Sequence, residues 1–407
     1  MSGAGVEGRR ILVLTNLYPP IAHGGYEVEC QGVVEHLRQR NEVLVLTSAK
    51  RRGEAPADPG VRRELPFLRR RRVIDALSPV YAIRAAKAAR RALEEFQPDL
   101  IYIWNGAQLS QAAIRVLETS GAPVAYRVCE HWFGALYRSH HSLLMRGLTG
   151  GRFKRMARFW NRLPALRIDA ERRVEVAISW NSEALRRQVD TPPLLEPVLE
   201  HVQLPATRQS EELVGIERRP APQATVGFVG RISPEKGIDV ALRALARLCD
   251  EGLEVHLQIA GAGPKDHRRE LEALAAELGI AGHVTFLGPL DVAGLKRFYA
   301  ELHALVVPSV WEEPAGLVLV EGALAGVPLV ASRVGGIPEI VRDPDEALLC
   351  PPGDPEALAA ALRRTLTEPE ETAARAERAN ERAQAFRITP YLKAMDEFLE
   401  KVENPSP

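Results

Sequence analysis

Cysteine is scarce in this sequence. Its 407 residues include four, Cys30, Cys129, Cys249 and Cys350. The C-x-x-C spacing that is typical of zinc and thiol redox sites does not occur, and scattered cysteines do not indicate a disulfide framework. This usage is typical of a reducing compartment, so we expect a cytoplasmic protein.

Long hydrophobic runs are also missing. No stretch reaches the roughly 18 apolar residues that a transmembrane helix needs. The N-terminus, MSGAGVEGRRILVL, lacks the apolar core and cleavage site of a leader peptide. Apolar residues make up 46% of the chain and charged residues 26%. These fractions are ordinary for soluble globular proteins, and the length predicts two or three domains.

The chain has no net charge overall, but its two halves carry opposite net charges. The formal charge is +0, yet residues 1–200 contain 31 Lys and Arg against 21 Asp and Glu, and residues 201–407 contain 22 against 32. This asymmetry predicts two halves with different partners. The sequence contains no recognised module for reading nucleic acid, so we expect no nucleic-acid partner.

Short apolar runs alternate with helical patterns in both halves. Runs bounded by polar residues are typical of strands that are buried in a parallel sheet, and their alternation with helices predicts an α/β protein with doubly wound sheets. The clearest predicted strands are 9–16, 98–105, 122–128, 224–231, 254–261 and 303–309. Between the two halves, residues 190–224 are rich in proline and are predicted to contain the end of the first domain and a linker.

The predicted domains follow from this alternation. Residues 1–203 are predicted to form an N-terminal Rossmann-like domain, and residues 204–385 a C-terminal Rossmann-like domain. Residues 386–407 include a helix with apolar residues at helical spacing, which we expect to pack back on the first domain.

Cations and glycines follow two strands of the second domain, at the sheet edge where ligands bind. Arg231 and Lys236 bracket the turn in FVGRISPEKG, and an Arg fork with a Lys point charge suits a diphosphate. Gly261 and Gly263 would let backbone N–H groups approach a phosphate. A solvated loop and a tight turn are the alternatives.

Carboxylates surround the start of an apolar helix that we expect to begin near Ala315. The amides of Ala315 to Val318 would offer donors to an anion. Glu313 precedes this end and Glu321 follows it, and such carboxylates accept hydrogen bonds from paired sugar hydroxyls. Alternatively, Glu312 and Glu313 only complement the helix dipole and Glu321 reaches solvent.

Several motifs occur in a fixed order: NLYPPIAHGGYE, GFVGRISPEKG, IAGAGP, VTFLGPL, VPSVWEEPAGLVLVEGALAGVPLVAS and VGGIPEIV. Together they closely resemble the retaining glycosyltransferases of family 4, whose signature is two glutamates separated by seven residues, here Glu313 and Glu321. The resemblance covers most of the chain and is looser between residues 50 and 200. It implies the GT-B fold, in which two Rossmann-like domains face a central cleft. The N-terminal domain, residues 1–203, would bind the acceptor, and the C-terminal domain, residues 204–385, would bind the nucleotide sugar.

The resemblance also implies roles for the matching residues. Arg231 and Lys236 would bind the donor diphosphate and stabilise the leaving charge. Glu313 would contact the donor sugar, Glu321 would hold the ribose, and the backbone around Leu290 would meet the nucleobase. The other residues implied at the donor site are Gly230, Gly261, Gly263, Ala315, Gly316, Leu317 and Val318.

The first domain matches the family less closely. Gly24 and Gly25 correspond to the loop that faces the cleft, close to phosphate and acceptor. Many members have a His-Asp-like pair after the fourth strand, but alignment on the tryptophan of YRVCEHWF places Cys129 and Glu130 in those columns. His131 follows, either as a contact to the donor sugar or as a polar loop residue. Glu130 and His131 therefore stay candidates for acceptor or sugar contacts.

Residues 137–173 form a basic segment with ten Arg and Lys and two acids. The segment is compatible with a basic amphipathic helix on the inner face of an anionic membrane. It is also compatible with a phosphate-bearing acceptor, and with a helix whose apolar stripe packs on the first domain.

The resemblance implies a hexosyltransferase that uses a nucleotide diphosphate sugar as substrate, with a UDP-sugar favoured, and no cofactor. The acceptor is an unidentified glycan, lipid-linked molecule or small molecule. The D-x-D pattern at Asp343 and Asp345 is predicted to be a turn, so we expect no required metal. A nucleotide-sugar epimerase of the same fold and a non-catalytic nucleotide-sugar-binding protein are the alternatives.

Overall fold

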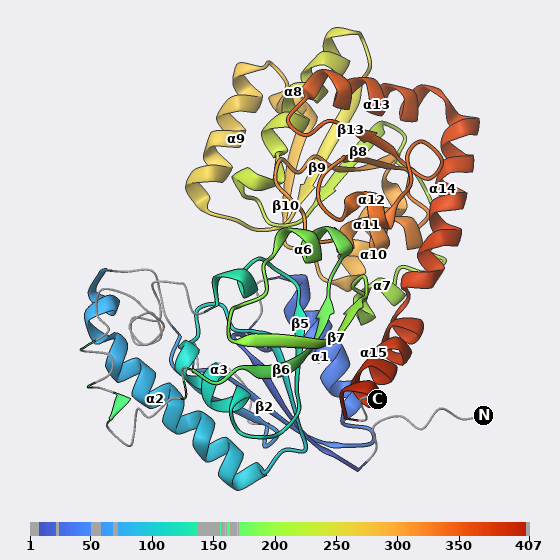
Figure 1. Cartoon of the computed structure of the whole chain (residues 1–407). Helices are drawn as coiled ribbons and strands as arrows, with labels where there is room; N and C mark the ends of the chain where they lie inside the picture. The colour runs from blue at the N-terminus through green and yellow to red at the C-terminus, as the bar shows by residue number, and fades with distance from the viewer. Residues whose placement is uncertain are drawn as a thin grey trace, which may run out of the picture. The chain divides into compact units, whose positions relative to one another are not determined.

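The computed structural model divides the chain into two compact units (Figure 1). The first unit comprises Met1–Gln203 and Leu392–Pro407, and the second comprises Leu204–Tyr391. The structure describes residues 8–21, 24–49, 58–67, 72–136, 155, 159, 161–162, 169 and 171–403. Most of the basic segment 137–173 lies outside these residues, so its predicted contacts stay predictions.

The first unit is built on a seven-stranded parallel sheet with the order β3-β2-β1-β4-β5-β6-β7. The central strands are buried along their whole length, which explains why they read as continuous apolar runs. The strand order reverses between β1 and β4. The strands are β1 (Arg10–Thr15), β2 (Glu42–Ser48), β3 (Val61–Leu65), β4 (Leu100–Asn105), β5 (Val124–Val128), β6 (Val174–Trp180) and β7 (Leu195–Val202).

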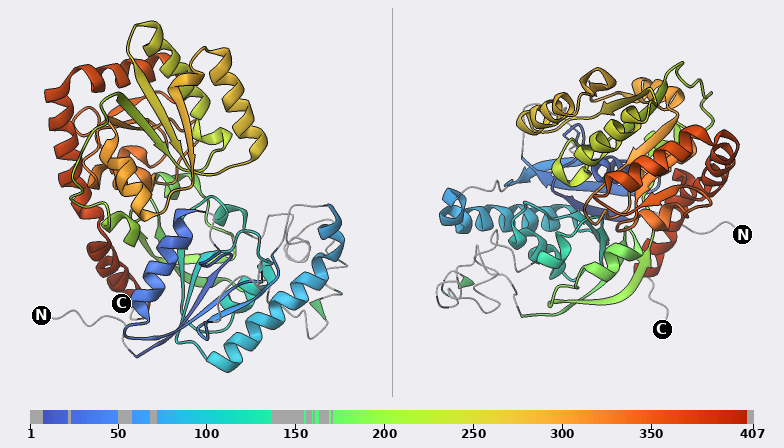
Figure 2. Two further views of the ribbon diagram at one scale, coloured as in Figure 1. Left: turned by 180° about the vertical axis from the view of Figure 1, so that it is seen from behind. Right: turned by 90° about the horizontal axis from the view of Figure 1, so that it is seen from above.

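Helices cover this sheet. The long helix α2 flanks it in both views of Figure 2, drawn in light blue, and packs against α3. Every residue of α3 is buried, and the helix begins after Ser110, whose side chain accepts a hydrogen bond from the amide of Ala112. The helices are α1 (Gly25–Leu37), α2 (Arg72–Phe96), α3 (Gln111–Glu118), the 3₁₀ turn η2 (Phe133–Ala135) and α6 (Glu183–Gln188).

The last helix, α15 (Ile388–Glu403), carries the chain from the second unit back to the first. Within the first unit, the hydroxyl of Tyr102 donates to Sδ of Met395 at 2.8 Å, and Phe398 stacks on His201 with 5.7 Å between the ring centroids. Met395 and Phe398 are buried. The apolar spacing of this helix therefore corresponds to a packed face.

The second unit repeats the architecture with six parallel strands in the order β10-β9-β8-β11-β12-β13. The strand order reverses between β8 and β11, as it does between β1 and β4 in the first unit. The strands are β8 (Ala224–Val229), β9 (Val255–Ala260), β10 (Val284–Gly288), β11 (Ala304–Val307), β12 (Leu329–Ser332) and β13 (Leu348–Cys350).

Two hydrophobic clusters fill the space between this sheet and its helices. One includes buried residues of α8 and α13, and the other includes residues of α10, α11 and α14. The helices are α7 (Arg208–Glu211), α8 (Ile238–Asp250), α9 (Lys265–Glu277), α10 (Val292–Glu301), α11 (Leu317–Leu324), α12 (Ile337–Ile340), α13 (Pro355–Thr367) and α14 (Pro369–Ala383), with 3₁₀ turns η4 (Pro234–Lys236), η5 (Ala281–His283) and η6 (Gln384–Phe386).

Two elements differ in detail from the sequence predictions. Residues 190–224 include the boundary between the two units at Gln203, but they also contain the edge strand β7 and the short helix α7. Half of the residues of β7 are exposed and only one is buried, so it lacks the apolar run that marks the central strands. Helix α11 begins at Leu317 rather than near Ala315, because Gly316 adopts a φ of +95°.

A search of the described helices finds none that is both long and apolar enough to cross a bilayer.

Candidate functional site

Two loops meet in the second unit where the strand order reverses. They follow β8 and β11, and crevices outside the carboxyl ends of strands at such a reversal are where α/β proteins bind ligands. The amide of Val310 donates to the carbonyl of Glu235 at 3.0 Å. A Cβ atom on Gly237, which has a φ of +65°, would lie 2.0 Å from the carbonyl oxygen of Pro308. Only glycine therefore allows the two loops to come this close.

The central contact between these loops is an ion pair. Nζ of Lys236 lies 2.5 Å from Oε1 of Glu313, and the hydroxyl of Ser309 donates to the same oxygen at 2.5 Å. Glu313 is buried, and Nζ of Lys236 also lies 5.9 Å from the centroid of the Trp311 ring. A buried carboxylate needs such partners to stay charged.

Arg231 lies on the same loop as Lys236 but has a different partner. Its guanidinium is 3.6 Å from Oε1 of Glu235, and its side chain is 56% exposed. The two predicted diphosphate ligands therefore share a loop, and Arg231 is placed to reach an anion in solution.

The glycines of IAGAGP allow two strand-exit loops to pack closely. The amide of Gly230 donates to the carbonyl of Ala260 at 3.0 Å. A Cβ atom on Gly261 would lie 1.8 Å from the oxygen of Gly230, and one on Gly263 would lie 1.9 Å from the oxygen of Ile232. This packing alone accounts for both glycines, and their contact with a phosphate stays a prediction.

Helix α11 starts at the same edge. Gly316 is its N-cap residue, so the first helical amides are those of Leu317 and Val318. The first amides of a helix have no partner within the helix and carry its positive dipole end, which suits an anion. Ala315 is buried and precedes the helix, so it does not contribute a helical amide as the sequence led us to expect.

Glu321 lies about one turn into α11 and is 7% exposed. The hydroxyl of Tyr299, in α10, donates to its Oε2 at 3.0 Å. Burial raises the pKa of Glu321 to about 7, although the hydrogen bond from Tyr299 lowers it in part. The sequence interpretation missed Tyr299, because a tyrosine 22 residues upstream carries no local signal.

Two further predicted features border this edge. Leu290 follows β10 and packs against the same cluster as α11. The loop VGGIPEIV is joined to the glutamate loop, since the amide of Gly335 donates to Oε2 of Glu312 at 2.9 Å and that of Gly336 to the carbonyl of Glu313 at 2.8 Å. Glu312 therefore binds a backbone amide of the neighbouring loop.

In the first unit, the predicted residues surround the start of α1 and the end of β5. The amide of Gly24 donates to Oε2 of Glu27 at 2.8 Å, and Gly25 is the first residue of α1. His131 lies 2.9 Å from Oε1 of Gln188 through Nε2. Burial raises the pKa of Tyr26, and the carboxylates of Glu27 and Glu130 add to this shift. Glu130 therefore lies in the electrostatic environment of α1.

A buried charge cluster that the sequence interpretation missed lies at the end of β5. Nη2 of Arg127 is 2.7 Å from Oε1 of Glu29 in α1, and both side chains are almost fully buried. Arg127 also donates to Oγ of Ser179 at 3.1 Å, to the carbonyl of Trp180 at 3.1 Å and to Oδ1 of Asn181 at 3.2 Å. The cluster ties α1, β5 and β6 together.

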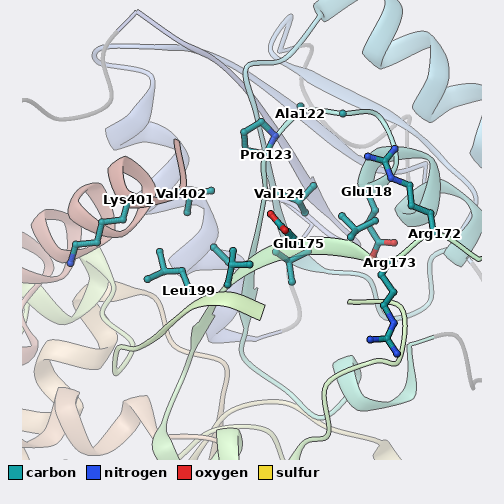
Figure 3. A pocket seen from close by; sticks show the side chains of 15 residues that line it. Glu118, Ala122, Pro123, Val124, Arg172, Arg173, Glu175, Leu199, Lys401 and Val402 are labelled. Atoms are coloured by element: carbon teal, nitrogen blue, oxygen red, sulfur yellow. The ribbon is translucent and has the colours of Figure 1, made fainter. Parts of the chain in front are cut away.

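A pocket of about 910 Å³ lies at the amino ends of the strands of this sheet, where β5 and β6 begin (Figure 3). Its lining includes Glu118, Glu175, Arg172, Arg173 and Lys401. The charged ends of the three cations lie apart from one another in Figure 3, so they do not converge on one anion.

The D-x-D pattern has a structural explanation. Oδ1 of Asp343 accepts a hydrogen bond from the amide of Leu349 at 2.9 Å, and its other oxygen pairs with Arg333. Asp343 thereby closes the turn before β13. Among the described residues, no group of three or more His, Cys, Asp or Glu side chains is placed to hold a metal ion.

Two family models match the chain. Residues 209–383 match the model described as Glycosyl transferases group 1, and residues 24–191 match the model described as Glycosyl transferase 4-like domain. The two matched regions correspond to the second and the first unit.

Individual proteins also match. The D-inositol 3-phosphate glycosyltransferase of Saccharomonospora viridis is 40% identical over 174 residues, which are 41% of this chain and 40% of that protein. The chain spans less than half the length of such curated relatives.

Solved structures match over nearly the whole chain. Sucrose-phosphate synthase from Thermosynechococcus elongatus has a TM-score of 0.72 at 20% identity, covering 98% of this chain and 100% of that one. Anabaena HepE, solved in complex with UDP-glucose, has a TM-score of 0.67 at 22% identity, covering 97% and 100%. At these identities the likeness shows a shared fold.

Proposed function

Because the chain belongs to the glycosyltransferases of the family-4 type with the GT-B fold, we propose that it moves a sugar from a nucleotide diphosphate sugar to a hydroxyl group of an acceptor, with retention of the anomeric configuration. The observation that carries the proposal is the ion pair of Lys236 and Glu313 at the edge of the sheet where α11 begins. This edge offers cations and helical amides to a diphosphate, and carboxylates to sugar hydroxyls.

The proposed reaction breaks the bond between the anomeric carbon and the diphosphate oxygen. The departing nucleoside diphosphate gains negative charge, which Lys236, Arg231 and the amides of Leu317 and Val318 stabilise. The acceptor oxygen bonds to the anomeric carbon on the same face, and its proton passes to the departing phosphate oxygen. No group on the chain needs to become covalently attached.

The two glutamates orient the donor. Glu313 accepts hydrogen bonds from hydroxyls of the transferred sugar, and Glu321 accepts them from the ribose. Cations on the chain neutralise the diphosphate, so no divalent metal is required. A UDP-sugar is the favoured donor, which agrees with the UDP-glucose bound to HepE, although at 22% identity that protein is a guide to the fold alone.

Donor turnover tests the proposal. The full chain, treated with EDTA, is supplied with UDP-glucose, GDP-glucose or ADP-glucose and mixed sugar acceptors, and nucleotide release is followed. We expect release from one nucleotide class, roughly 100-fold slower in Glu313→Ala and Arg231→Ala. Arg297→Ala, at an exposed position of α10, is the matched control and should keep the rate.

The outcomes separate the alternatives. Nuclear magnetic resonance of the product reports its anomeric configuration, and an inverted product would contradict retention. Release that stops in EDTA and returns with a divalent ion would contradict metal independence. No release from any donor would contradict the transferase; isomerisation of the donor sugar would then indicate an epimerase.

A further inference from the structure

Tyr299 and Glu321 form a buried pair between two helices of the second unit. The Tyr299 side chain is fully buried in α10, and its hydroxyl donates to Oε2 of Glu321 at 3.0 Å. Glu321 is 7% exposed and lies about one turn into α11, the helix that begins at the proposed donor edge. A tyrosine hydroxyl that donates to a carboxylate holds one oxygen in place and leaves the other free to turn toward a ligand.

Several charged groups on the neighbouring elements have other partners. Helix α11 packs against α7, α12, α14, β11 and β12, and the two strands carry no charged residue. Glu211 of α7 pairs with Arg387, and Lys296 of α10 pairs with Glu212. In α14, Arg375 contacts Thr372 and Glu371, and Arg382 donates to carbonyl groups of α12 and pairs with Glu346. Glu339 of α12 is half-buried.

None of these groups shifts the pKa of Glu321, which is set by burial and by the hydroxyl of Tyr299. Burial raises the pKa to about 7, and the hydrogen bond lowers it from the higher value that burial alone would cause. Burial and the hydrogen bond therefore act on the pKa in opposite directions, and Tyr299 favours the charged form of the carboxyl group.

We propose that Tyr299 is a positioning residue for the nucleotide: its hydroxyl holds Glu321 as an oriented carboxylate that accepts hydrogen bonds from both hydroxyls of the ribose. The proposal rests on the proposed function, because it needs a ribose at Glu321. A protonated carboxyl group has lost acceptor capacity and would bind the diol less well.

The sign of the effect follows from these causes. Removing the hydroxyl in Tyr299→Phe raises the pKa of Glu321 further, so a larger fraction is protonated at pH 7. Nucleotide affinity then falls at neutral pH and is regained at higher pH, where Glu321 ionises again. A role in packing alone would weaken binding equally at every pH, because the phenylalanine ring keeps the shape of the core.

The test is calorimetric titration of the full chain with whichever of UDP, GDP or ADP it binds, between pH 6 and 9. For Tyr299→Phe we expect the Kd at pH 7 to rise about 3- to 10-fold. We expect the midpoint of the pH dependence to rise by about half a unit to one unit, and the two Kd values to converge near pH 9. In Glu321→Gln this pH dependence should vanish, with or without the tyrosine hydroxyl.

The first unit offers a matched control. The hydroxyl of Tyr126 donates to the buried carboxylate of Glu118, as Tyr299 does to Glu321. Tyr126→Phe removes the same kind of hydrogen bond and should leave the pH midpoint of nucleotide binding unchanged. Melting curves of both variants report whether each is folded.

Each outcome has a distinct meaning. A weaker Kd for Tyr299→Phe with an unchanged midpoint, or an unchanged Kd, overturns the positioning role and leaves the proposed function standing. If the unmodified chain binds none of the three nucleotides, the proposed function fails, and the role of Tyr299 fails with it.

Discussion

The two units have similar sheet topologies but differ in how deeply their charged pairs are buried. Both sheets reverse their strand order beside the first strand, at β1 and β4 in one unit and at β8 and β11 in the other. In the second unit, the charged pair at this point joins two loops, and the Lys236 side chain is 18% exposed. In the first, the pair of Arg127 and Glu29 joins β5, the strand next to β4, to α1, and it is 0% and 2% exposed. The two units share a topology, and their charged pairs differ in position and in exposure.

Lys236 and Arg127 differ in whether a ligand could reach the charged group. In the proposed reaction, a diphosphate that approaches Lys236 would offer phosphate contacts to an ammonium group that is partly exposed. Arg127 is surrounded by five hydrogen-bond contacts to Glu29, Ser179, Trp180 and Asn181, and no solvent reaches it. We therefore expect the Arg127 cluster to stabilise the first unit, whereas the Lys236 pair belongs to the proposed donor site.

The largest expected effect is on stability. Arg127→Met should lower the free energy of unfolding by about 3–5 kcal/mol, because it leaves Glu29 charged and buried without its partner. Urea unfolding followed by tryptophan fluorescence measures this, since four of the five tryptophans belong to the first unit. The double variant Arg127→Met with Glu29→Met should recover part of the loss. A single variant as stable as the unmodified chain would break the contrast.

The next effect is on turnover. Lys236→Met should slow nucleotide release by roughly 100-fold, because the leaving diphosphate loses a preorganised cation. Initial rates at saturating donor measure it. Lys296→Met is the matched control, since Lys296 pairs with Glu212 on an exposed surface, and it should keep the rate. A rate loss of similar size in both variants would show that Lys236 has no special role.

A smaller effect tests the support of Glu313. Ser309 is fully buried, and its hydroxyl holds the same oxygen as Lys236. Ser309→Ala should reduce donor turnover by about 10-fold, which corresponds to the loss of one hydrogen bond to a charged group. Ser179→Ala removes a hydroxyl beside Arg127 and should leave donor turnover within about twofold, according to the stability role of that cluster. The reverse ranking would exchange the roles of the two units.

The smallest effects compare the stability that one helix cap contributes in each unit. Ser182 caps α6 in the first unit and Asp354 caps α13 in the second, each by accepting an amide hydrogen bond. Changing either to alanine should cost about 1 kcal/mol of unfolding free energy. Equal losses, measured by urea unfolding, would show that the larger differences above come from the charge clusters. A much larger loss in one unit would reveal general fragility there.

The sequence predicted the second unit better than the first for a physical reason. The α/β class and the GT-B fold are confirmed, because buried parallel strands read as apolar runs and the motifs around Glu313 occupy consecutive positions. Strand β7 was missed because an exposed edge strand has no apolar run.

The remaining site residues could not be predicted, because their contacts join distant parts of the chain. Glu29 and Arg127 are 98 residues apart, and Tyr299 lies 22 residues from Glu321 on another helix. Neither spacing corresponds to a helical or strand period. For the glycines of IAGAGP, the residue type correctly predicted that another group comes close to the backbone. It did not predict that this group is a backbone carbonyl of the neighbouring loop.

The most direct test of the central claim is nucleotide binding by calorimetry in the presence of EDTA. The unmodified chain and Lys236→Met are each titrated with UDP, GDP and ADP. The account predicts that the unmodified chain binds at least one of them and that Lys236→Met binds it at least about 10-fold more weakly, as expected for the loss of a charge-assisted contact. Equal affinities in the two proteins, or no binding of any nucleotide, would contradict a diphosphate site at the edge of the second sheet.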